Sequence, residues 1–179
     1  MSDIDAFAAS LLEESKRFYE LAIESNGGPG EQPNLHAALM LAFCSLEAHV
    51  NAVADEVAIR SGISVHDQAL LLERVVELKK GTHSLHPKAL KISRLEDRIF
   101  VLHRLGIKPN PDGAWAAGLA SATDLRNKLT HPKVAPAITT GSVRKALEAV
   151  IETIDALYVA VYNRRFPAAN RRLASRLDF

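Results

Sequence analysis

A chain of 179 residues, of which 47% are hydrophobic and 24% charged, has the balance of an ordinary folded domain. Its formal net charge of +1 excludes a protein that attracts nucleic acid through overall charge, so any such binding requires a local basic patch. The single cysteine, Cys44, excludes an internal disulfide and indicates a reducing compartment. Its neighbours are mostly apolar, which predicts a buried thiol.

The length predicts one domain, residues 1–166, followed by a basic tail, residues 167–179, that we expect to be helical. The tail could contact RNA phosphates or dock on the domain, and its apolar residues favour docking. The N-terminus is acidic and has no signal-peptide pattern. The apolar run Ala37 to Leu46 is far shorter than the ~20 residues of a membrane span. We therefore expect a cytoplasmic protein without a membrane segment.

Apolar residues at helical spacing predict a first helix over residues 3–25, which the Gly-rich stretch after it ends. Asn34 is a suitable N-cap for a second helix that reaches about Ile59. Ser64 and Asp67 resemble a capping box, which predicts a third helix through Lys80, with Gly81 ending it.

The segment 82–87 contains His83 and His86 and is predicted to be a solvated loop, because further metal ligands are lacking nearby. A fourth helix is predicted to begin at Lys88 or Ser93 and to end at Leu105. Two more helices are predicted over residues 112–130, and from 140 or 142 to about 164. No alternating strand pattern is evident. The sequence thus predicts an all-α bundle of about five to seven mostly antiparallel helices.

The segment Asp124 to Pro132 carries the most informative cluster of polar residues. At about 100° per residue, Thr130, Asn127 and His131 lie near ~40°, ~100° and ~140° from Arg126, so the four share one face of a helix. The leucines of the same segment lie on the opposite side. Because the residue before a proline avoids the helical conformation, the helix is predicted to end at His131.

These side chains suit phosphate chemistry. Arg126 offers a permanent charge and a planar fork of donors for phosphate oxygens. His131 can carry a proton near neutral pH, and Asn127 can orient either group or a substrate hydroxyl. The segment contains no carboxylate pair and no set of metal ligands, so we expect neither a metal nor a cofactor.

The hexapeptide from Arg126 to His131 resembles the R-x4-6-H motif of HEPN domains, in which a polar residue commonly follows the arginine, as Asn127 does here. The resemblance implies an all-α and often dimeric fold. Many members are metal-independent ribonucleases, frequently toxins or antiviral effectors. Two other segments match the bare spacing: Arg98 to His103, which has the pattern of a core helix, and Arg60 to His66, which crosses Gly62, where a helix is predicted to end. The alternative for the motif itself is an ordinary helix end with a surface arginine and histidine.

The second helix also resembles the family, which often carries a Glu and an Asn there, as Glu47 and Asn51 do. Four residues apart, they share a face. They are predicted to line a cleft that faces Arg126 and, with Lys128 and Thr130, to bind substrate. A solvated or interhelical polar pair is an equally good interpretation.

A metal-free ribonuclease of this kind would use the RNA 2′-hydroxyl to attack the adjacent phosphorus of single-stranded RNA. His131 would transfer a proton, Arg126 would stabilise the phosphate charge, and Asn127 would position an oxygen. One histidine cannot readily act as base and acid at once, so we expect a homodimer with a composite active site. The small residues of segment 116–122 suit such an interface. A toxin would also need an antitoxin or other regulatory protein. The alternative function is a non-catalytic module that binds a nucleotide, a nucleic acid or a protein partner.

Overall fold

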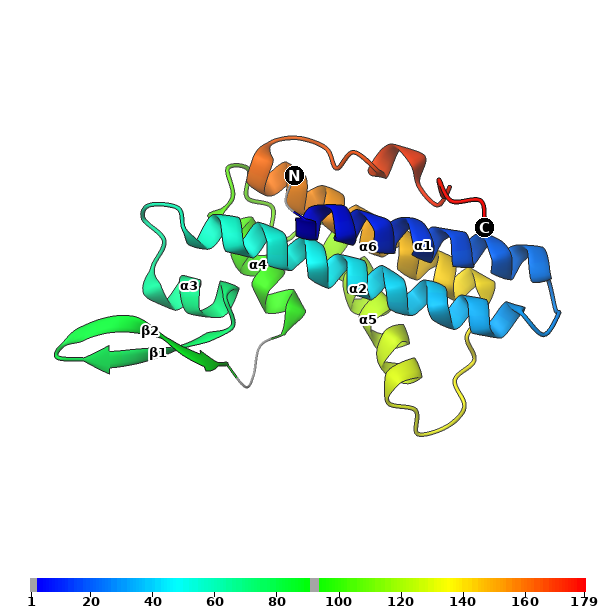
Figure 1. Cartoon of the computed structure of the whole chain (residues 1–179), viewed down its shortest axis with the longest axis horizontal. Helices are drawn as coiled ribbons and strands as arrows, with labels where there is room; N and C mark the ends of the chain where they lie inside the picture. The colour runs from blue at the N-terminus through cyan, green and yellow to red at the C-terminus, as the bar shows by residue number, and fades with distance from the viewer. Residues whose placement is uncertain (1–2, 91–93) are drawn as a thin grey trace.

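The computed structural model describes residues 3–90 and 94–179. In that part of the chain it contains six α-helices, one two-stranded antiparallel sheet and a short 3₁₀ helix, η1 (Figure 1). In chain order the elements are α1 (Asp3–Ser25), α2 (Glu31–Ala58), α3 (Val65–Leu71), β1 (Arg74–Lys79), β2 (Thr82–Ala89), α4 (Leu95–Leu105), α5 (Trp115–Thr130), α6 (Thr140–Tyr162) and η1 (Ala169–Arg171). The predicted helical bundle is confirmed, with one hairpin added to it.

Three long helices, α1, α2 and α6, form the body of the molecule, and α4 and α5 cross beneath it (Figure 1). Helices α1 and α2 are held together by two buried hydroxyls: Ser15 Oγ donates to Ala38 O and Ser45 Oγ donates to Ala8 O, each at 2.7 Å. Such bonds let serine enter an apolar interface without leaving a donor unpaired. The core comprises mainly aliphatic side chains of α2 and α6, with smaller contributions from α1, α4 and α5.

Helix α2 is the central helix of this core. By length and composition α2 could cross a membrane. The sequence analysis considered only its segment from Ala37 to Leu46, which is too short for that. However, 61% of its most apolar 18-residue window is buried inside the molecule. The apolar surface of α2 is therefore largely used for packing against the neighbouring helices.

The predicted third helix is wrong beyond Leu71, because residues 74–89 form the β1–β2 hairpin (Figure 1). Lys79 pairs with Thr82 across a two-residue turn in which Lys80 and Gly81 have φ of 49° and 79°. Two positive φ values in succession are the signature of a type I′ turn, whose twist suits a hairpin. Gly81 thus forms this turn and does not end a helix.

Several predicted boundaries also change. Helix α2 begins at Glu31 and not at Asn34, and Gly30 at its N-cap makes no side-chain capping bond. Helix α5 begins at Trp115, three residues after the predicted Asp112. Of the two predicted starts of the fourth helix, Lys88 lies in β2 and Ser93 lies outside the described residues.

The C-terminal tail is not the helix that was predicted, since η1 is its only regular element in the described chain. It runs back along α1 (Figure 1), where Arg171 forms an ion pair with Glu13. The backbone N–H of Ser175 donates to Glu20 at 2.9 Å, and Arg17 Nε donates to the backbone oxygen of Phe179 at 2.7 Å. The tail thus docks on the domain, the favoured alternative, and apolar contacts contribute: Leu173 packs against the core, and the ring centroids of Phe179 and Phe18 are 6.0 Å apart.

Candidate functional site

The candidate site is built around the C-terminal end of α5. The helix packs against α6 and the core through Trp115, Leu119 and Ala122, which are all buried. Its last residue is Thr130, and His131 caps it with a φ of −130° and a ψ of 58°. The N–H of His131 still donates to Asn127 O at 2.9 Å. The following proline therefore ends the helix where predicted, and it leaves the exposed His131 side chain at the helix end.

Three of the predicted site residues, Asn127, Lys128 and His131, line one open pocket of about 660 Å³. The rest of its lining is Asp124 and the segment that follows the helix, from Lys133 to Ala137. The pocket therefore gathers two ammonium groups, an imidazole, an amide and the carboxylate of Asp124 at a position that solvent reaches. This set of groups can hold a phosphodiester and move a proton beside it.

Arg126 lies apart from that pocket. Its guanidinium carbon is 5.1 Å from the ring centroid of Phe43 on α2, and its side chain is half-buried. The Nε atom of Arg126 is buried and has no hydrogen-bond partner among the described residues. The predicted single face of α5 is thus divided: Arg126 turns toward α2, whereas Asn127 and His131 turn toward the chain after the helix.

The hydroxyl of Thr130 already donates a hydrogen bond within the protein. Its Oγ1 donates to the backbone oxygen of Arg126 at 3.1 Å, one turn back in the same helix. This local bond is common for threonine in helices and satisfies the hydroxyl within the protein.

Glu47 and Asn51 line a separate, smaller pocket of about 180 Å³ together with Glu73, Leu95 and Arg98. The arginine in their pocket is therefore Arg98 of α4, and not Arg126 as predicted. Arg98 is 6% exposed, donates to Leu71 O at 3.0 Å and pairs with Glu73 at 3.5 Å. The sequence interpretation did not identify Arg98 as a pocket residue, because its helical pattern resembled that of the core.

Cys44 of α2 is influenced by both Glu47 and Arg126. The predicted burial of this residue is wrong, since Cys44 is exposed. Partial desolvation and the nearby Glu47 carboxylate raise the pKa of the thiol, and the positive charge of Arg126 opposes them. Arg126 and Glu47 therefore both lie close enough to Cys44 to change the pKa of its thiol.

The segment from Arg98 to His103, which also has the R-x4-6-H spacing, lies in the partly buried helix α4, as the sequence predicted. His103 is fully buried and stacks on Trp115 with 4.5 Å between ring centroids and 9° between ring planes. Neither ring nitrogen of His103 has a hydrogen-bond partner in residues 3–90 and 94–179. Burial lowers the pKa of His103 to about 4, so its ring is neutral at pH 7.

Within the described residues, no three His, Cys, Asp or Glu side chains are grouped so that they could hold a metal ion. Comparison of the chain with protein-family models, with curated proteins and with solved structures finds no match.

Proposed function

We propose that the protein is a metal-independent endoribonuclease that cleaves single-stranded RNA at the C-terminal end of α5. The observation that carries this proposal is the pocket in which Asn127, Lys128 and His131 meet around an open space large enough for a nucleotide. The resemblance of the Arg126–His131 segment to HEPN domains supports the same reaction. A cytoplasmic location and a role as a toxin or defence effector, restrained by an antitoxin or other protein, belong to the same proposal.

In this reaction the RNA 2′-hydroxyl attacks the adjacent phosphorus, and the bond from phosphorus to the 5′-oxygen breaks. The products are a 2′,3′-cyclic phosphate and a 5′-hydroxyl. His131 moves the proton, either from the attacking hydroxyl or to the leaving oxygen. Lys128 offers positive charge to the phosphate in the same pocket, and Asn127 donates a hydrogen bond to one of its oxygens.

The position of Arg126 is the reason to propose a homodimer. Within one chain Arg126 and His131 do not line the same pocket, so one copy does not present the arginine to the phosphate beside His131. A two-fold dimer through α5 supplies a second copy of both residues to the same cleft. Of the small residues in the expected interface, Gly118 and Ala122 already pack within the chain, and Ala117, Ala120 and Ser121 remain exposed.

The test is cleavage of a fluorescent single-stranded RNA by purified protein in EDTA. We expect fragments that end in 2′,3′-cyclic phosphate or its hydrolysis product, and an intact DNA strand of the same sequence, because DNA lacks the nucleophile. His83→Ala, which changes an exposed histidine on the hairpin, serves as the control and retains activity. A requirement for Mg²⁺, or cleavage of the DNA strand, contradicts the proposed mechanism.

The same separation of Arg126 from His131 favours the alternative, a binding module without catalysis. In that case the pocket at the end of α5 holds a phosphate or nucleotide, and nothing is cleaved. Binding of RNA with no cleavage under any tested condition, by a protein that sediments as a monomer at micromolar concentration, supports the module over the enzyme.

A further inference from the structure

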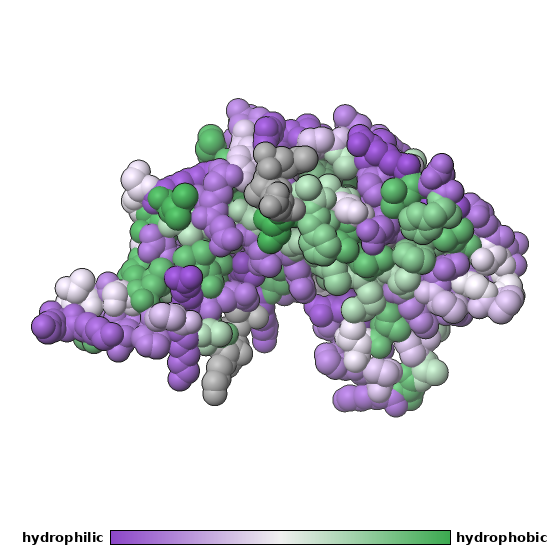
Figure 2. Space-filling model, viewed as in Figure 1, coloured by the Kyte–Doolittle hydropathy of each residue, from purple (hydrophilic) through white to green (hydrophobic). Residues whose placement is uncertain are grey.

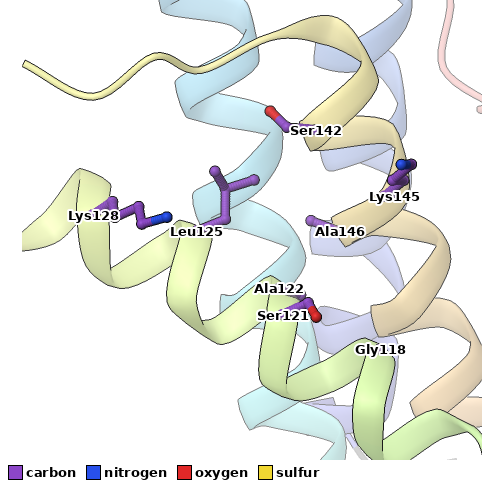
Figure 3. A pocket seen from close by; sticks show the side chains of 8 residues that line it. All are labelled: Gly118, Ser121, Ala122, Leu125, Lys128, Ser142, Lys145 and Ala146. Atoms are coloured by element: carbon purple, nitrogen blue, oxygen red, sulfur yellow. The ribbon is translucent and has the colours of Figure 1, made fainter.

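A groove between α5 and α6 lies next to the pocket that contains His131. The two helices approach closely at Gly118, where an added Cβ would lie 3.2 Å from the Cβ of Ala149. The lining of the groove extends from that contact toward the last turn of α5 and the first turn of α6, and its volume is about 370 Å³ (Figure 3). Its lining residues are Gly118, Ser121, Ala122, Leu125, Lys128, Ser142, Lys145 and Ala146.

The groove has an apolar floor and a polar rim. Ala122 and Ala146, which are 2% and 3% exposed, form the floor with Leu125. The rim carries Ser121, Ser142 and the ammonium groups of Lys128 and Lys145. Both hydroxyls already donate within the protein, Ser121 Oγ to Ala117 O at 3.1 Å and Ser142 Oγ to Thr139 O at 2.8 Å, so the two lysines supply the donors for a ligand. In Figure 3 the Lys128 side chain extends along the groove side of α5, and Ser142 lies on the opposite wall, in the first turn of α6. A floor of this kind accepts a flat apolar group, and such a rim accepts an anion.

The charge of the lining is entirely positive. It contains two lysines and no carboxylate, and in residues 3–90 and 94–179 neither lysine belongs to an ion pair. Both ammonium groups attract an anion that enters the groove. The partial positive charge at the N-terminal end of α6, near Ser142, favours an anion as well.

Lys128 lines both the groove and the pocket of His131, so the two spaces adjoin at this side chain. A ligand that occupies both must be elongated, with an anionic group near Lys128. A strand of RNA has this form, because phosphates alternate with flat bases. The dimer proposed above can pack through Ala117 and Ala120 of α5, which do not line the groove, so the groove remains open to a ligand.

We propose that the groove binds the nucleotide next to the cleaved phosphodiester, with its base on the Ala122–Ala146 floor and its phosphate between Lys128 and Lys145. The inference rests on the proposed function for the identity of the polymer. The volume of the groove is at the lower end of the ~300–1,000 Å³ typical of ligand sites, which suits one nucleotide. Lys145 thereby becomes a substrate-binding residue that no sequence pattern indicated.

The first experiment measures binding separately from cleavage. Full-length His131→Ala protein is titrated into a fluorescein-labelled ten-nucleotide single-stranded RNA in EDTA, and anisotropy is followed at several salt concentrations. We expect Lys145→Gln in this background to weaken binding about fivefold, and to reduce the slope of log affinity against log salt by about 0.7, the value for one phosphate contact on a single strand. Lys108→Gln, which removes an exposed lysine outside the groove, is the matched control and leaves both quantities unchanged.

The second experiment fills the groove. Ser121 of α5 and Ala6 of α1 are both exposed helical residues, but only Ser121 lines the groove. We expect Ser121→Phe to weaken binding of the RNA at least fivefold and Ala6→Phe to leave it unchanged. With an abasic strand of the same length, the Ser121→Phe effect should shrink, because the floor then has no base to hold. Circular dichroism melts show that each variant is folded.

The outcomes separate the two proposals. If wild-type protein cleaves RNA but Lys145→Gln and Ser121→Phe bind it as tightly as their controls, the groove proposal is wrong and the ribonuclease stands. If the wild-type protein does not cleave RNA but the two groove variants bind it more weakly than their controls, the groove proposal stands and the ribonuclease is wrong. Equal effects of Lys145→Gln and Lys108→Gln indicate only diffuse attraction and overturn the groove proposal.

Discussion

Two arginine–histidine pairs with the same spacing lie in this chain, and the structure puts them in opposite environments. Arg98 and His103 are 6% and 0% exposed, within α4. Arg126 is half-buried, and His131 is exposed at the end of α5. The spacing of a motif therefore does not decide its role. What differs is the sequence around it: Pro132 ends α5 directly after its histidine, whereas α4 continues past His103 to Leu105, so its histidine remains inside the bundle.

The largest expected effect is on cleavage by the exposed pair. We expect His131→Ala to lose on the order of 10²-fold in rate, the scale of one positioned acid–base group, and Arg126→Ala to lose at least as much. Steady-state cleavage of the fluorescent RNA measures both. Variants that cleave at the wild-type rate while circular dichroism shows them folded would remove α5 from the mechanism.

The same two variants test the composite site. In a mixed dimer of Arg126→Ala and His131→Ala chains, one copy retains the histidine and the other the arginine. If the residues act together across the two-fold axis, mixing two nearly inactive proteins restores measurable cleavage. If both act from one chain, the mixture remains as inactive as its components.

The buried pair should affect stability and not chemistry. His103→Ala removes a ring that stacks on Trp115, and we expect a loss of about 3 kcal/mol in the free energy of unfolding, as for other buried rings. Urea denaturation measures it. Cleavage per folded molecule should be unchanged. A variant of full stability but impaired cleavage would show that α4 belongs to the active site.

The buried ring should also make stability depend on pH. The pKa of His103 is about 4 in the folded protein and about 6.5 when unfolded, and His49, also buried, has a pKa of about 4. Between these values the unfolded chain binds more protons, so stability is complete above pH 6.5 and falls as the pH is lowered toward 4. Between pH 7 and pH 5 we expect each histidine to cost about 2 kcal/mol. His103→Phe should reduce that loss by about 2 kcal/mol, measured by urea denaturation at both pH values.

The smallest expected effect is at Thr130. Its hydroxyl is occupied by the backbone oxygen of Arg126, so Thr130→Val should lower the free energy of unfolding by about 1 kcal/mol or less. We expect the cleavage rate to change by less than about threefold, since a contribution of that size is small beside an acid–base group. A loss of tenfold or more would restore Thr130 as a substrate-binding residue.

The sequence predicted those features that local chemistry controls. Apolar spacing located most of the helices, and Pro132 located the end of α5. The hairpin was missed although its signal was local. Lys80 and Gly81 form a two-residue turn, but the apolar residues before it also satisfy a helical pattern, so Gly81 was interpreted as a helix end.

Tertiary structure alone decided which arginine meets which partner. A helical projection places Arg126, Asn127 and His131 on one arc, but about 140° separates the first from the last, and two different neighbours fill that arc. The aromatic ring of Phe43 attracts the guanidinium of Arg126, and the segment after Pro132 encloses His131. Glu47 and Asn51 share a face of α2, as expected, but the packing of α4 brings Arg98 to them. Distances along a helix are fixed by its geometry, whereas the partners across it depend on contacts between residues far apart in the chain.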